Sequence, residues 1–153
     1  MNTSSRTRFL ILALAAAVLV LPAAGQSRTV AQKKKLALEQ YASAERMREA
    51  LTGRPVAERT RSAYERVIES YRRVYYTSPS SARADESIVA VAELLAEIGN
   101  RFHDPKMSEA AVGQYEFLRR EYPGSKYRGE ALFTIAQIYR DDLHDNEKAR
   151  EVW

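Results

Sequence analysis

The chain repeats its own pattern at a fixed interval. Residues 71–81 align with residues 115–125 at an offset of 44 positions, and both segments begin with tyrosine and end on a proline turn. Continued without a gap, this offset places Glu86 on Glu130 and apolar positions on apolar positions. Self-similarity with a period of roughly 20 to 50 residues is typical of arrays that stack one supersecondary unit. The sequence therefore predicts a stack of similar units.

Each unit has the pattern of a helical hairpin. Apolar residues recur at i, i+3, i+4, i+7, i+10 and i+11, the spacing of one helix face; they are Tyr64, Val67, Ile68, Tyr71, Val74 and Tyr75. Pro79 ends this helix. In the next helix, residues 86–99, almost every side chain is small or apolar, and the polar positions form one acidic strip of Glu86, Glu93 and Glu97. We expect that helix to be buried on most sides.

Turn and capping residues divide the remainder into further helices. Gly99-Asn100 is expected to stop one helix, and Asp104-Pro105 to start the next, which runs to Tyr122. Ser125 is expected to cap a helix that reaches about Asp142, and Asp145 to start the last one. Upstream, residues 30–51 form an amphipathic stretch that Gly53 and Pro55 close. Because the sequence lacks the alternation of a strand, we expect an all-α fold.

The first 25 residues have the pattern of a secretory signal peptide. Arg6 and Arg8 precede an unbroken apolar run over residues 9–21, and small residues follow at 23–25. The run of 13 is shorter than the ~20 apolar residues that span a bilayer. We expect cleavage after Gly25 and export to the periplasm or cell envelope, with an uncleaved membrane anchor as the alternative. The signal segment is the expected contact with a membrane.

Charge does not favour nucleic acid as a ligand. Lys plus Arg number 24 against 20 Asp plus Glu, and removing residues 1–25 with Arg6 and Arg8 leaves 22 against 20. Because the protein is expected to leave the cytoplasm and its arginines alternate with glutamates, we expect no nucleic-acid partner. The basic run at residues 33–35 is either a solvated helix start or a contact for anionic lipid or polymer.

The sequence contains none of the catalytic motifs that spacing can reveal. It has no cysteine, no His-Glu-x-x-His, no glycine-rich phosphate loop and no Gly-x-Ser-x-Gly elbow. His103 and His144 occupy equivalent places, each immediately before a capping aspartate, and we interpret them as loop-packing residues. We expect no catalytic residue, cofactor or metal within the 153 residues.

The hairpin pattern resembles the tetratricopeptide repeat (TPR). The first-helix signature of a large apolar, a small and an aromatic residue is matched by Leu132, Ala136 and Tyr139. The second-helix signature is matched by Ala111, Tyr115, Leu118 and Pro123. The resemblance implies an α-α superhelix of TPR-like hairpins over residues 56–153, with a truncated last repeat, after an N-terminal helix or cap at 26–55. Two departures are the period of 44, against the usual ~34, and residues 30–51, which lack the signature.

In that family the first helices of the hairpins line a concave groove. The matching positions here form the predicted groove, which comprises Glu86, Val89, Glu93 and Glu97 in one unit and Glu130, Phe133, Gln137, Arg140 and Asp141 in the next. We expect this groove to bind an extended or helical segment of an envelope protein that carries basic groups. The alternative is that its acids only keep a concave face soluble.

A narrower resemblance concerns residues 113–127 and the helix that follows. They are similar to the N-terminal repeat region of exported N-acetylmuramoyl-L-alanine amidases, which use zinc to hydrolyse peptidoglycan. The resemblance implies that this chain is the non-catalytic N-terminal part of such an enzyme, with the zinc ligands beyond Trp153. More broadly, the chain resembles free-standing exported TPR adaptors that work in outer-membrane assembly and cell-division coordination. Both alternatives imply an interaction scaffold.

Overall fold

A computed structural model describes residues 28–152, and all regular structure in that range is helical. The elements are α1 (Val30–Thr52), η1 (Val56–Glu58), α2 (Arg61–Thr77), α3 (Ala84–Arg101), α4 (Pro105–Glu121), α5 (Arg128–Gln137), the π-helical turn η2 (Ile138–Asp142) and α6 (Asn146–Glu151). The all-α prediction is confirmed for these residues. The predicted signal peptide, residues 1–25, and Trp153 lie outside them.

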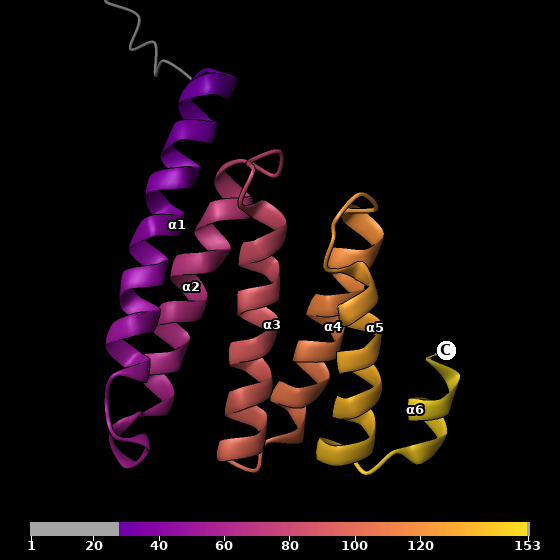
Figure 1. Ribbon diagram of the computed structural model, residues 1–153. Coiled ribbons are helices and arrows are strands. Elements are labelled where there is room, and N and C mark those ends of the chain that lie inside the picture. The colour runs from indigo at the N-terminus through magenta and orange to yellow at the C-terminus, as the bar shows by residue number, and fades with distance from the viewer. Residues whose placement is uncertain (1–27, 153) are drawn as a thin grey trace, which may run out of the picture.

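Successive helices run in opposite directions, so the chain rises and falls along a row of hairpins (Figure 1). Side-chain contacts also join alternate helices. Arg48 of α1 reaches Glu93 of α3, while the ring of Tyr75 of α2 lies 6.2 Å from the ring of Phe117 of α4. Helices α1 and α3 therefore share one layer, and α2 and α4 share the other.

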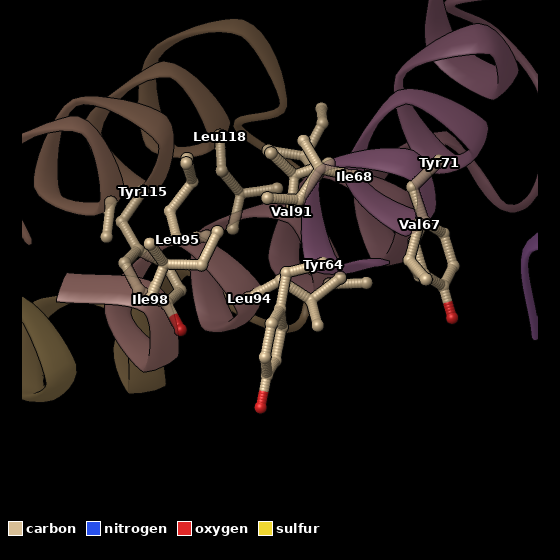
Figure 2. Packing of buried hydrophobic residues seen from close by; sticks show 14 of the residues in the cluster. Tyr64, Val67, Ile68, Tyr71, Val91, Leu94, Leu95, Ile98, Tyr115 and Leu118 are labelled. Atoms are coloured by element: carbon tan, nitrogen blue, oxygen red, sulfur yellow. The ribbon is translucent and has the colours of Figure 1, made fainter. Parts of the chain in front are cut away.

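The core is centred on α2, α3 and α4. The six α2 positions predicted from periodicity are all buried, including the large rings of Tyr64 and Tyr71. Figure 2 shows Tyr64, Val67, Ile68 and Tyr71 of α2 in the same cluster as Val91 and Leu95 of α3 and Leu118 of α4. As predicted, α3 buries most of its circumference, because its small and apolar residues face α2 on one side and α4 on the other.

Two predicted helix starts are confirmed by their caps. The Asp104 side chain accepts a hydrogen bond from the Lys106 N–H at 3.2 Å, directly before Pro105, the first residue of α4. The Asp145 side chain accepts one from the Lys148 N–H at 2.9 Å at the start of α6. A side-chain acceptor at this position satisfies an N–H group that has no partner within the helix.

The prediction that Gly99 stops α3 was wrong. The helix continues to Arg101, and Gly99 is buried against α4, where an added Cβ would lie 2.2 Å from the Ser108 Oγ. The chain turns at His103 instead, which adopts the left-handed conformation with φ 51°, and His144 does the same after η2 with φ 54°. The absence of a side chain at Gly99 thus permits close helix packing.

The prediction that Ser125 caps the fifth helix was also wrong. Its Oγ accepts a hydrogen bond from the Tyr127 N–H at 3.2 Å and donates one to Asp85 Oδ2 at 2.8 Å, so it links the loop to α3. Helix α5 begins later, at Arg128. The last helical turn is also wider than expected, because Leu143 donates its N–H to the Ile138 carbonyl and closes the π-helical turn η2.

Candidate partner-binding groove

The structure brings one half of the predicted groove together with residues of α1. A pocket of about 200 Å³ lies between α1 and α3. Its lining comprises Tyr41, Glu45 and Arg48 from α1, Glu86, Val89, Ala90 and Glu93 from α3, and Tyr127 before α5. Three of the four groove positions predicted on α3 therefore line one concave site.

The acids of the strip are paired with arginines of the same chain. Arg48 Nη2 lies 2.6 Å from Glu93 Oε2, and Arg59 Nη1 lies 3.6 Å from Glu97 Oε1. Glu86 forms an ion pair with Arg83, which precedes α3. Two of these acids therefore form ion pairs that join α1 and the segment after it to α3.

Tyrosine hydroxyls form a second set of partners for these acids. Tyr71 donates a hydrogen bond to Glu45, and Tyr64 donates one to Glu97. Burial raises the pKa of both hydroxyls above the ordinary value, and the accepting carboxylates raise each pKa further. Each phenol therefore remains a protonated hydrogen-bond donor above the pH at which a free tyrosine ionises.

Tyr41 closes the α1 side of the pocket. Its ring centroid lies 6.0 Å from that of Tyr71, in an edge-on arrangement, and the Arg83 guanidinium lies 5.3 Å from the Tyr41 centroid. Burial raises the pKa of the Tyr41 hydroxyl, and the charges of Glu45 and Glu86 raise it further. The pocket wall is thus an aromatic surface with carboxylates on both sides.

The repeat pattern did not predict that residues of α1 line the groove. Tyr41, Glu45 and Arg48 lie at i, i+4 and i+7, so they share one face of α1. That spacing could have indicated a polar face, but the segment lacks the repeat signature on which the predicted groove depended. Only the packing of the helices shows that this face of α1 lies opposite α3.

The α5 half of the predicted groove is more dispersed. Phe133 is 52% exposed and Glu130 is also exposed, whereas Gln137 is half-buried. Arg140 and Asp141 form a two-point ion pair with N–O distances of 2.6 and 2.8 Å, and the Arg140 guanidinium lowers the pKa of the Asp141 carboxyl. Both lie in η2, where the wider turn changes their rotation about the helix axis.

Tyr115 of α4 connects the two halves. Burial raises the pKa of its hydroxyl, and the charges of Glu93 on α3 and Glu130 on α5 raise it further. The Tyr115 hydroxyl therefore experiences the charge of one acid from each half of the predicted groove.

The two predicted positions in η2, Arg140 and Asp141, line other cavities. Asp141 lines a cavity of about 420 Å³ together with Asp142, Asn100, His103 and His144. Both histidines are exposed at their left-handed positions. Among residues 28–152, the His, Asp and Glu side chains form no group of three that could hold a metal ion. No helix within the same range is long and apolar enough to cross a bilayer.

Comparison of the chain with protein-family models, curated proteins and solved structures finds no match.

Proposed function

We propose that this chain is a non-catalytic protein-interaction scaffold of the cell envelope, built as a superhelix of TPR-like hairpins. The observation that carries the proposal is the pocket between α1 and α3, where Val89 and Tyr41 provide apolar surface beside Glu86 and Glu93. Phe133 of α5, which belongs to the predicted groove, is a second apolar side chain that is exposed. A row of apolar contacts flanked by charge suits an extended or helical peptide segment.

The charge of the pocket supports a basic ligand. Its lining has three carboxylates, from Glu45, Glu86 and Glu93, against the guanidinium of Arg48 in the lining and that of Arg83, which pairs with Glu86, so the formal charge is −1. Arg48 is itself an example of the expected contact, since it lies against Glu93 as an arginine of a bound segment would lie against Glu130. Opposite charge of this kind steers association and fixes the register of a bound segment.

Two versions of this function are supported by the sequence resemblance. In the first, residues 113–127 belong to the N-terminal region of an N-acetylmuramoyl-L-alanine amidase, and the scaffold positions a zinc domain that cuts peptidoglycan. In the second, the chain is a free-standing adaptor in outer-membrane assembly or cell division. The coding DNA beyond the codon of Trp153 distinguishes them: zinc-ligand motifs of an amidase support the first, and an early stop codon supports the second.

Peptide binding tests the groove itself. Fluorescence anisotropy of the full chain against a library of labelled peptides that combine Arg and Leu measures the affinity of each. We expect Phe133→Ser and Glu130→Lys each to lower the affinity for the peptide that binds best by roughly tenfold. This is the effect of losing about 1.4 kcal/mol at a central contact. Both side chains are exposed, so these changes leave the core intact.

Tyr76→Ser is the matched control, because Tyr76 is 72% exposed on α2, in the other layer of the structure. It should leave binding unchanged. Equal weakening by Tyr76→Ser and Phe133→Ser, or no binding by any member of the library, would contradict the proposed groove.

A further inference from the structure

Among residues 28–152, the N-terminal end of α1 extends beyond the other helices. Helix α1 has 23 residues against 17 for α2, which at 1.5 Å per residue makes it about 9 Å longer. Figure 1 shows its first turns beyond the ends of α2 and α3. Residues 28–35 are all exposed, and Ala37 is the first buried residue of the helix. The packing of the core therefore does not require the side chains of this end.

This projecting end has charge of one sign. We call residues 28–38 the basic tip, because they include Arg28, Lys33, Lys34 and Lys35 and no acidic residue. Successive positions on a helix are separated by about 100°, so the three lysines point to different sides of the axis. Positive charge therefore surrounds the end of α1.

The charge arrangement does not serve the stability of the helix. The N-terminal end of a helix has a partial positive charge, which favours acidic side chains. The first turn of α1 has none, whereas α3 has Asp85 and Glu86 there and α5 has Glu130. Helix stability thus gives no reason for a run of lysines at this position.

We propose that the basic tip docks on an anionic membrane surface. The charges match the negative headgroups of such a surface, and each Lys or Arg close to it strengthens binding by roughly fivefold. Val30, 68% exposed, and Leu38, 46% exposed, add apolar side chains beside the lysines. Docking through this end leaves the pocket between α1 and α3 accessible, because Tyr41 and Arg48 lie further along α1.

Vesicle binding of the full chain tests this inference. The readout is the partition coefficient on vesicles that contain phosphatidylglycerol divided by that on pure phosphatidylcholine vesicles. The apolar segment at residues 9–21 contributes to both coefficients, so the ratio isolates the effect of charge. We expect the chain to prefer the anionic vesicles at low salt, and high salt to weaken that preference.

The triple variant Lys33→Glu, Lys34→Glu and Lys35→Glu should reduce the ratio by about a hundredfold. Each of the three lysines is expected to strengthen binding to the anionic vesicles by roughly fivefold, and the three factors multiply. Glutamates near the start of a helix are compatible with its dipole, and circular dichroism should show an intact fold. The control variant Arg54→Glu, Arg66→Glu and Lys106→Glu changes the net charge equally at exposed residues away from the basic tip, after α1 and in the first turns of α2 and α4. It should keep most of the preference.

Three results would overturn the proposal: no preference of the unmodified chain for anionic vesicles, an equal loss in both triple variants, or binding to a soluble polyanion such as polyphosphate without a preference among vesicles. None of them bears on the peptide groove, since the test leaves its residues unchanged.

Discussion

Replacing glycine by alanine should change the free energy of unfolding in opposite directions at two positions in neighbouring helices. Gly99 lies in α3 and Gly113 in α4, and both are inside a helix. A Cβ at Gly99 would lie 2.2 Å from the Ser108 Oγ, 2.8 Å from the Ser108 backbone N and 3.2 Å from the Asp104 backbone O. A Cβ at Gly113 would have no atom within 4 Å.

The magnitudes follow from two effects. Replacing glycine by alanine inside an exposed helix stabilises it by about 1 kcal/mol, and at Gly113 this is the whole effect. At Gly99 the same gain is opposed by overpacking, which costs about 1–3 kcal/mol. Two of the three close atoms are backbone atoms, Ser108 N in α4 and Asp104 O at its N-cap. A rotamer change cannot relieve these contacts, so the cost is near the upper end. We expect Gly99→Ala to destabilise by roughly 1–2 kcal/mol.

Urea unfolding of both variants measures this difference. Gly113→Ala should raise the midpoint concentration and Gly99→Ala should lower it, with an unchanged slope. The double variant Gly99→Ala, Ser108→Ala should recover part of the loss, because it removes the Oγ but leaves the backbone N. If Gly99→Ala stabilised the protein as much as Gly113→Ala does, the close approach of α3 and α4 would be refuted.

Two further predictions concern the backbone at a turn and the response to pH. His144 has φ 54°, a left-handed conformation in which a Cβ is unfavourable. His144→Gly should therefore raise the free energy of unfolding by a few tenths to about 1 kcal/mol. A loss of stability in urea unfolding would contradict this. Burial raises the pKa of Tyr75 from 10.0 to about 12. Because the unfolded chain releases that proton at a lower pH than the folded chain does, the free energy of unfolding should fall as pH rises from about 10 to about 12. Urea unfolding at a series of pH values should show a smaller fall for Tyr75→Phe, and an identical profile for the two proteins would argue against the raised pKa.

Features that depend on neighbouring residues could be predicted from the sequence. The spacing of Tyr64, Val67 and Tyr71 identifies the buried face of α2, because every third or fourth residue of a helix faces the same side. Asp104 and Asp145 identify the starts of α4 and α6, because a cap forms within a few residues. The all-helical class follows from these local patterns.

Only the tertiary structure decided which helix faces the acidic strip. Arg48 and Glu93 are 45 positions apart, and no local pattern pairs them, because their contact depends on how α1 lies against α3. Gly99 has the local pattern of a helix stop, yet the close approach of Ser108 makes it a packing position inside a longer helix. Helix periodicity and capping are properties of adjacent residues, whereas these contacts require distant segments to be placed beside one another. The sequence therefore determined the helices and their apolar faces, while packing decided the shape and charge of the groove.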